Sequence, residues 1–290
     1  MNVVIVGLGL IGGSLAIDLR ANGFAKKIIG VEQSEEHCTL ARYRGLVDDI
    51  LPLSSALKQA DVVILAVPVN YIIKLLPTIL DQVASHTTVL DMGSTKNEIC
   101  NSVKDHPKRK QFVPTHPMAG TEFSGPTAAQ RNLFFNRTAV ICDPQNSDPE
   151  HLRVVDKIFE LLQTRKTYMS SVEHDLHTAY ISHLSHISSF VLANTVLDKE
   201  KNVGTIFDLA GGGFDSTVRL AKSSPDTWAP IFEQNHKYII EALATYIKKL
   251  QHFQTTLEQH NFDETKELMK HANGIKRILK NINSPQGKQA

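Results

Sequence analysis

Hydrophobic residues in the first half of the chain alternate between short β-branched runs and stretches with helical spacing. Val3–Val6 and Ile28–Val31 are typical of buried strands, and Ile11–Ala21 and Glu35–Arg44 are typical of the helices that follow them. Further buried strands are predicted at Asp61–Val67, Thr87–Asp91, Gln111–Pro114 and Thr138–Ile141. Because strands alternate with helices and read as continuous apolar runs, the pattern predicts a parallel sheet covered by helices.

The pattern changes after a polar stretch with two prolines, Cys142–Pro149, which indicates an interdomain junction. Beyond it, apart from a brief strand near Thr167–Met169, apolar residues recur at helical spacing. The predicted helical stretches are Pro149–Gln163, Ser171–Lys199, Pro225–His260 and Asp263–Lys280. We therefore predict an α/β domain over residues 1–145, an all-α domain over residues 146–282 and a polar tail over residues 283–290.

Composition narrows the class of protein. Lysine and arginine (31) nearly balance aspartate and glutamate (30), so the chain lacks the basic excess that favours nucleic-acid binding. The longest apolar stretch, Val62–Leu80, is interrupted by Pro68, Asn70, Lys74 and Pro77 and does not predict a membrane span. Three widely spaced cysteines and an N-terminus without a cleavable leader favour a soluble, cytoplasmic protein. We expect no nucleic-acid or membrane partner.

A glycine-rich turn joins the first predicted strand to the first predicted helix. Gly7, Gly9 and Gly12 occupy the first, third and sixth positions of G-x-G-x-x-G, with Leu10 and Ile11 inside the turn. The first glycine permits the tight turn, the second lets the backbone approach a pyrophosphate, and the third allows close packing of helix on strand. The helix N-terminus adds N–H groups and a positive dipole end. The turn predicts the dinucleotide site of a Rossmann-type domain.

An acidic residue indicates which dinucleotide is bound. Glu32 ends the second predicted strand, at the spacing where a carboxylate accepts hydrogen bonds from the adenine ribose. A carboxylate repels the 2′-phosphate of NADP, and the following Gln33-Ser34 offers no arginine to hold that phosphate. We therefore predict NAD as the cofactor.

Three more segments follow predicted strands, at the sheet edge where ligands of open parallel sheets bind. Val67 and Pro68 lie in the first segment, Leu65–Val69, and are expected to border the cofactor. The second, Asp91–Lys96, contains Ser94, which is expected to contact it as well. The third, THPMAGTEFSG, contains His116, an imidazole that can accept a proton near neutral pH.

Together with Gly211–Trp228, these segments resemble the prephenate/arogenate dehydrogenase family of tyrosine biosynthesis, over nearly the whole chain. The resemblance implies a Rossmann-type domain followed by a helical domain, arranged as in 6-phosphogluconate dehydrogenase, and a homodimer formed through the helical half. It also implies that NAD takes hydride from the ring carbon bearing the 4-hydroxyl group, while the ring carboxylate leaves as CO₂. The product from prephenate would be 4-hydroxyphenylpyruvate.

The resemblance assigns roles to individual side chains. His116 would polarise or deprotonate the 4-hydroxyl group, and Ser94 would hydrogen-bond to His116 and to the nicotinamide side. Arg219 would bind a substrate carboxylate. The other residues expected to border the substrate are Thr121, Glu122, His183, His186 and Trp228. One position departs from the family pattern, because Asp215 directly follows Phe214 and Ser216 stands where an acid is frequent.

Alternatives remain for several of these residues. Ser94 could cap a helix at Glu98–Val103, and His183 and His186, which share a helix face, could be core residues. His174 and His177, with Glu173 and Asp175, superficially resemble metal ligands, but hydride transfer to NAD requires no metal and we predict none.

Alternatives also remain for the function. Arogenate, whose amino group a nearby acid such as Glu122 would favour, is the close alternative substrate. A β-hydroxyacid dehydrogenase would need a lysine that Tyr180–Asn194 lacks. A catalytically silent NAD-binding protein is the remaining alternative.

Overall fold

The computed structural model describes residues 1–283, and the predicted polar tail from residue 284 onward lies outside the described residues. By its internal contacts the chain divides into two compact units, residues 1–239 and the residues from 240 onward. No helix in the described part of the chain is both long and apolar enough to cross a membrane. All predicted site residues lie in the first unit.

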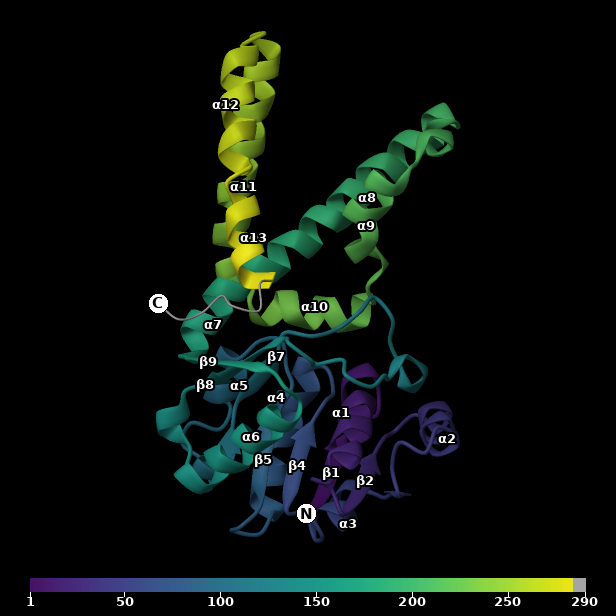
Figure 1. The fold of residues 1–290 in the computed structure, drawn as a ribbon, viewed down its shortest axis with the longest axis vertical. Coiled ribbons are helices and arrows are strands. Elements are labelled where there is room, and N and C mark those ends of the chain that lie inside the picture. The colour runs from purple at the N-terminus through teal and green to yellow at the C-terminus, as the bar shows by residue number, and fades with distance from the viewer. Residues whose placement is uncertain (284–290) are drawn as a thin grey trace. The chain divides into compact units, whose positions relative to one another are not determined.

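A six-stranded parallel sheet in the order β3-β2-β1-β4-β5-β6 forms the centre of the first unit (Figure 1). Its strands are β1 (Asn2–Val6), β2 (Lys27–Val31), β3 (Asp49–Ile50), β4 (Val62–Leu65), β5 (Thr88–Asp91) and β6 (Phe112–Val113). The strand order reverses direction between β1 and β4, which is where open sheets of this type form a ligand crevice. The predicted Rossmann-type parallel sheet is confirmed.

The continuous apolar runs reflect burial of both sheet faces. Val3 and Ile5 of β1 belong to one core, with helices α1, α2 and α6. Val4 and Val6 belong to the other core, with α3, α4 and α5. Successive strand side chains point to opposite faces, so burial of both faces makes the strand centres continuously apolar and leaves polar residues such as Asn2, Lys27 and Asp91 at strand ends. The helices are α1 (Leu10–Ala21), α2 (Glu35–Tyr43), α3 (Leu53–Leu57), α4 (Val69–Gln82), α5 (Asn97–Asn101) and α6 (Pro149–Leu161).

A second sheet of three strands carries the predicted histidine. Strand β7 (Thr115–Pro117) pairs antiparallel with β8 (Thr138–Cys142), and β8 pairs parallel with β9 (Arg165–Met169). Short 3₁₀ turns lie around it at Arg109–Gln111, Pro126–Ala128 and Pro144–Asn146. The polar stretch at 142–149 connects β8 to α6, and both α6 and β9 follow it. The predicted domain boundary at residue 145 stays a prediction.

The predicted long helix from Ser171 is interrupted. It consists of α7 (Ser171–Thr178), a π-helical turn η4 (Ala179–His183) and α8 (Leu184–Val203). Next come η5 (Ile206–Leu209), α9 (Gly212–Val218), η6 (Arg219–Lys222) and α10 (Pro225–Gln234). Ser189 on α8 joins α9 and η6 to this helix, because its hydroxyl donates to Thr217 O (3.1 Å) and accepts from Ala221 N (3.0 Å).

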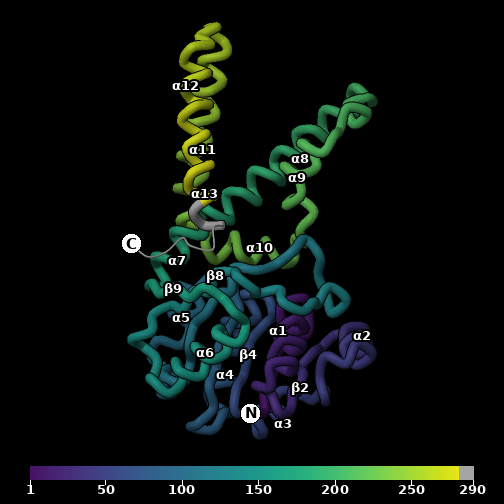
Figure 2. The backbone as a smooth tube through the Cα atoms, in the orientation of Figure 1, coloured from purple at the N-terminus to yellow at the C-terminus, as the bar shows by residue number. Residues whose placement is uncertain are grey.

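Helix α11 (His236–Glu258) begins after Asn235, so the single helix predicted over Pro225–His260 is two helices. In the second unit, α11 and α12 (Phe262–Ala272) lie side by side, followed by α13 (Ile275–Asn283), as the backbone tube shows (Figure 2). A hydrogen bond of 2.9 Å between the hydroxyls of Thr256 and Thr265 ties α11 to α12.

Candidate active site

The glycine turn lies at the carboxyl edge of the large sheet, beside the end of β4. Gly7 has φ +93°, and a Cβ atom there would lie 2.6 Å from the carbonyl oxygen of Ala66. A Cβ atom on Gly12 would lie 2.0 Å from the carbonyl oxygen of Gly7. Both distances are far below van der Waals contact, so the turn and the close approach of α1 require glycine at these positions.

The middle glycine differs from the other two. The nearest atom to a Cβ on Gly9 would be the backbone nitrogen of Gly125, 4.0 Å away. Gly9 is the N-cap of α1 and makes no side-chain cap, so the N–H groups of Leu10, Ile11 and Gly12 have no partner within the helix. Open space beside amides at a positive helix end fits the pyrophosphate of a dinucleotide.

Glu32 lies next to this turn. Its Oε2 atom accepts a hydrogen bond from Leu8 N (3.1 Å), and Oε1 accepts from Gln33 N (2.9 Å) and Ser34 N (3.0 Å). Three backbone donors hold the carboxylate at the end of β2 beside the glycine turn. The acidic side chain is therefore fixed beside the turn, and its contact with the adenine ribose stays a prediction.

Val67 and Pro68 border the same edge. Val67 Cγ1 lies 2.7 Å from where a Cβ of Gly7 would be, and Pro68 is the N-cap of α4. Ser94 follows β5 and is half-buried. The hydrogen bond expected between Ser94 and His116 is absent from the described part of the chain, and the role of Ser94 stays a prediction.

His116 is held in β7, opposite Val140 of β8, and only 8% of its surface is exposed. Its Nδ1 atom lies 2.8 Å from Nε2 of His174. Its Nε2 atom has no hydrogen-bond partner within residues 1–283 and is not fully buried. Burial, with smaller contributions from His174, Lys96 and His183, lowers the pKa of His116 well below its ordinary value. The imidazole is therefore neutral near pH 7 and can accept a proton.

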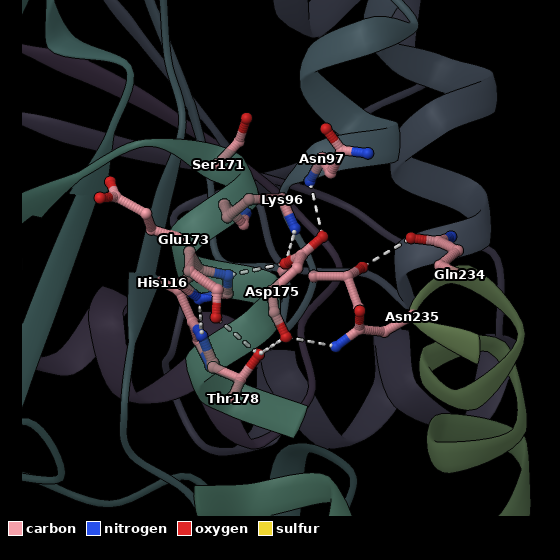
Figure 3. Close-up of polar contacts among 12 residues, drawn as sticks. Lys96, Asn97, His116, Ser171, Glu173, Asp175, Thr178, Gln234 and Asn235 are labelled. Atoms are coloured by element: carbon pink, nitrogen blue, oxygen red, sulfur yellow. Dashed lines mark hydrogen bonds and ion pairs between the residues drawn. The ribbon is translucent and has the colours of Figure 1, made fainter. Parts of the chain in front are cut away.

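His174 and Asp175 form a buried pair at the start of α7. Asp175 Oδ1 lies 2.7 Å from His174 Nδ1 and accepts a hydrogen bond from Lys96 N (2.8 Å), while Oδ2 accepts from Asn97 N (2.8 Å). Figure 3 shows Asp175 between Lys96 and Asn97 on one side and Asn235 on the other. Ser170 and Glu173 close the helix start with a reciprocal capping box. His116, His174 and Asp175 thus form one continuous hydrogen-bonded chain.

Lys96 is a fully buried cation at this site. Its Nζ atom pairs with the carboxylate of Asp91 and donates to Thr115 O (2.8 Å). Asp91 also accepts hydrogen bonds from Gly93 N (2.8 Å) and Thr115 N (3.2 Å). The pair therefore joins the end of β5 to the start of β7, directly before His116.

His183 and His186 both contact Trp228. His183 ends the π-helical turn, is 1% exposed, and packs edge-on to the indole at 6.0 Å between centroids. His186 stacks on the indole at 3.4 Å. Asn235 Nδ2 donates to His183 Nδ1 (3.0 Å), and burial lowers the pKa of His183 to about 4. Burial also lowers the pKa of His186, so both rings are neutral near pH 7.

Arg219 and Glu122 are brought together across 97 positions of sequence, with 3.3 Å between Nη1 and Oε2. The arginine side chain is half exposed (50%), whereas that of Glu122 is 23% exposed. Asp215, the residue that departs from the family pattern, pairs with Lys222 (2.7 Å). The carboxylate of Asp215 therefore pairs with Lys222, which follows Arg219 in the same turn.

A cavity of about 640 Å³ lies beside the glycine turn. It is lined by Thr121, Glu122, Phe123, Ser124, Thr127, Ala128 and Gln130. Arg44, directly after α2, donates to the carbonyl oxygens of Pro126 and Ala129 and so anchors the cavity wall to this helix. Thr121 and Glu122 therefore line a cavity that a ligand bound at the glycine turn would adjoin.

Comparison with known proteins identifies the family. Residues 15–168 match the nucleotide-binding domain of prephenate dehydrogenase, and residues 170–271 match its dimerization domain. The chain belongs to the prephenate dehydrogenase family. The boundary between the two matched domains directly precedes α7, so His116 comes from the first domain and His174 from the second.

Individual family members are similar to this chain over most of its length. A prephenate dehydrogenase of Bacillus subtilis is 32% identical over 262 residues, which are 89% of this chain and 71% of the relative. The structure of Aquifex aeolicus prephenate dehydrogenase in complex with hydroxyphenyl propionate and NAD⁺ is 30% identical, with a TM-score of 0.86 over 96% of this chain and 97% of that one. Synechocystis arogenate dehydrogenase is 29% identical, with a TM-score of 0.74 over 96% of this chain and all of that one. The predicted resemblance and fold class are confirmed.

The structure adds residues of this family member that sequence reasoning did not place in the site. His174 and Asp175 were considered only as metal ligands, together with His177 and Glu173, which are exposed. Within residues 1–283 no three such side chains gather as a metal site. The available signal was the adjacent His-Asp pair in the first turns of a helix capped by Ser170, but its contact with His116 spans 58 positions and leaves no local pattern.

Proposed function

We propose that the protein is an NAD-dependent prephenate dehydrogenase that forms 4-hydroxyphenylpyruvate and CO₂, a step of tyrosine biosynthesis. The observation that carries the proposal is His116, a neutral buried imidazole whose Nε2 atom has no hydrogen-bond partner within residues 1–283. Family membership supports the reaction class. The fold alone would leave the chemistry open.

When bound, NAD supplies a hydride acceptor for the hydrogen on C4 of the substrate. His116 Nε2 accepts the 4-hydroxyl proton as C4 becomes a carbonyl carbon. The carboxylate on C1 leaves as CO₂, and its bonding electrons enter the ring, which becomes aromatic. The phenolate oxygen then takes the proton back from His116, so the protein ends in its starting protonation state.

Glu32 supports NAD rather than NADP as the cofactor. Three backbone N–H groups hold its carboxylate beside the glycine turn, where a 2′-phosphate would meet a like charge. The Aquifex relative was crystallised with NAD⁺. We expect a higher kcat/KM with NAD than with NADP.

Arg219 supports an anionic substrate. Half of its side chain is exposed, which leaves donors for a carboxylate in addition to the contact with Glu122. Trp228 and the half-buried, neutral His186 offer a flat, mostly apolar surface suited to a ring, and His183, which is 1% exposed, packs edge-on against the indole. These side chains are the proposed substrate contacts, together with Thr121 and Glu122.

Arogenate is the second candidate substrate, because Glu122 is an acidic side chain in the cavity wall and could hold the amino group. The Synechocystis relative is an arogenate dehydrogenase. We place prephenate first because Arg219 already offsets the charge of Glu122.

We also propose that the protein is a homodimer formed through its helical part. Residues 170–271 match a dimerization domain, and α11 exposes apolar side chains at Ile240, Ile247 and Leu250. Exposed apolar surface of this kind is typical of an interface. Light scattering coupled to size-exclusion chromatography should give twice the chain mass, and a monomer at micromolar concentration would contradict the proposal.

One assay tests the function. NADH or NADPH formation is followed with prephenate or arogenate and with NAD or NADP, in all four combinations. Prephenate with NAD should give the highest kcat/KM, and His116→Asn should lower kcat by a factor on the order of 10² to 10⁴ while the Kd for NAD is unchanged. Absence of turnover in all four combinations would remove the proposed function.

A further inference from the structure

We propose that His174 and Asp175 are positioning residues, which hold His116 in the tautomer with a proton on Nδ1 and an open lone pair on Nε2. The proposal rests on the proposed function, in which Nε2 accepts the substrate's hydroxyl proton. A neutral imidazole has two tautomers, and only the one with a bare Nε2 can act as a base at that atom. A base with the wrong tautomer at the working nitrogen loses its activity.

The hydrogen-bonded chain begins at Asp175, which acts as an acceptor. Its Oδ1 atom accepts from Lys96 N at 2.8 Å, and its Oδ2 atom accepts from Asn97 N at 2.8 Å (Figure 3). A carboxylate that receives two backbone N–H groups is held as an acceptor. His174 Nδ1, 2.7 Å from Oδ1, must therefore carry a proton and donate it to Asp175.

The next link fixes His116. Burial lowers the pKa of His174, so this ring is neutral near pH 7, and with a proton on Nδ1 its Nε2 atom is an acceptor. His116 Nδ1 lies 2.8 Å from that acceptor and must donate to it. Because His116 is also neutral, its Nε2 atom is left without a proton. The order of donors therefore follows from Asp175 and from the neutrality of both rings.

The surrounding contacts hold His174 and Asp175 in place. Thr178 Oγ1 donates to His174 O (2.9 Å), and Asn235 Nδ2 donates to Asp175 O (2.7 Å), so the first turns of α7 are fixed at both residues. His174 and Asp175 are each 1% exposed. A ring flip at His174 would place a carbon against the carboxylate and lose both hydrogen bonds.

The same chain stabilises the charge that forms during turnover. When His116 Nε2 takes the hydroxyl proton, the imidazolium donates through Nδ1 to His174, whose Nδ1–H points to the anionic Asp175. The other groups facing these rings are Lys96, which is paired with Asp91, and the neutral His183. Asp175 is thus the carboxylate that offsets the transient positive charge.

Two substitutions at one position separate hydrogen bonding from packing. In His174→Gln the side-chain amide oxygen can still accept from His116 Nδ1, whereas His174→Leu fills the space without an acceptor. We expect His174→Leu to lower kcat for prephenate by a factor on the order of 100 or more, with the Kd for NAD unchanged. His174→Gln should recover most of that loss.

Nitrogen-15 NMR of histidine-labelled, substrate-free enzyme reads the tautomer directly. The resonances of His116 are assigned as those that disappear in His116→Asn. We expect an Nδ1–H form of His116 in the wild type and in His174→Gln, and a mixture of both tautomers in His174→Leu. An Nε2–H form in the wild type, or equal kcat in His174→Leu and wild type, would overturn the proposal.

The wild-type spectrum does not depend on His174→Leu, so a leucine variant that fails to fold leaves the test intact. It also needs no turnover. An enzyme that shows the Nδ1–H form but oxidises neither prephenate nor arogenate would support the positioning role and refute the proposed function.

Discussion

Two parts of the proposed active site are built in opposite ways. The glycine turn depends on the absence of side-chain atoms, because a Cβ at Gly12 would lie 2.0 Å from the carbonyl oxygen of Gly7. The imidazole chain depends on matched donors and acceptors, with 2.8 Å between His116 and His174 and 2.7 Å between His174 and Asp175. The first is a steric constraint between close neighbours in sequence, and the second joins segments 58 positions apart.

The difference determines how each part fails. Adding one carbon to the turn forces two backbone segments apart. The imidazole chain is instead sensitive to the loss of a hydrogen-bonding partner. Its buried polar groups become costly when a partner is removed, because the remaining group stays desolvated without a hydrogen bond. The most damaging substitution is therefore expected where a buried charge loses its partner.

Lys96→Met should have the largest effect on stability. The fully buried ammonium group is paired with Asp91, and its removal leaves a carboxylate without a compensating charge. Loss of one partner of a buried ion pair typically costs about 3 to 5 kcal/mol. The free energy of unfolding is measured by urea denaturation of Lys96→Met and of the double variant Lys96→Met/Asp91→Asn. The double variant should be more stable than the single one, and equal losses would show that the charge is not the cause.

Gly12→Ala tests the steric part and should cost about 1 to 3 kcal/mol, the range found for overpacked sites. Gly23→Ala is the control for backbone conformation, because Gly23 has φ +68° but nothing within 4 Å of a Cβ. Gly211→Ala, with open space and φ −118°, controls for the substitution itself. Destabilisation in the order Gly12, Gly23, Gly211, with weaker NAD binding only for the first, is expected. An equally weakened Kd for NAD in Gly23→Ala would contradict a local steric role.

The same contrast explains what the sequence could predict. The turn was found because Gly7, Gly9 and Gly12 lie in one short motif between a strand and a helix, so that spacing alone describes the geometry. The parallel sheet was found because both of its faces are buried, which makes its strands continuous apolar runs. His116 was found through a motif, and the structure places it in β7, within hydrogen-bonding distance of His174.

The polar network could not be predicted in the same way. Asp175 accepts from the backbone of Lys96 and Asn97, 79 and 78 positions away, and backbone N–H groups carry no residue signature. Helix α4 was not predicted: Val62–Leu80 was weighed only as a membrane span, and in the structure Pro68 is the N-cap of α4 and Pro77 lies within it. The π-helical turn that ends at His183 is a single turn, which is too short to produce a recognisable hydrophobic periodicity in the sequence.

Acid sensitivity should separate the polar part from the steric part. The pKa of His183 is about 4, below the ordinary value near 6.5, so the unfolded chain binds a proton here at higher pH than the native chain. This contribution to stability is fully present above pH 6.5 and is lost as the pH falls toward 4, by up to about 1.4 kcal/mol per pH unit. The groups facing His183 that enter this balance are Asp175, His174 and His186.

His183→Asn isolates that contribution, because the amide oxygen can still accept from Asn235 but does not titrate. Urea unfolding at several pH values between about 7 and 4.5 should show a shallower loss of stability in the variant, by close to one proton. Parallel pH profiles of variant and wild type would contradict the assignment. Gly23→Ala, which alters only the backbone, should keep the wild-type slope.

Glu122→Gln should have the smallest effect on folding and the most specific effect on substrate choice. Its partner Arg219 is half exposed, so loss of this pair should change the free energy of unfolding by less than about 1 kcal/mol. If the carboxylate selects the amino group of arogenate, the ratio of kcat/KM for arogenate to that for prephenate should fall several-fold, because Arg219 is freed to bind the keto acid. Asp215→Asn removes the same charge from a more exposed pair with Lys222, outside the cavity wall, and should leave the ratio unchanged. A ratio that moves equally in both variants would show that net charge, rather than the position of Glu122 in the cavity wall, sets the preference.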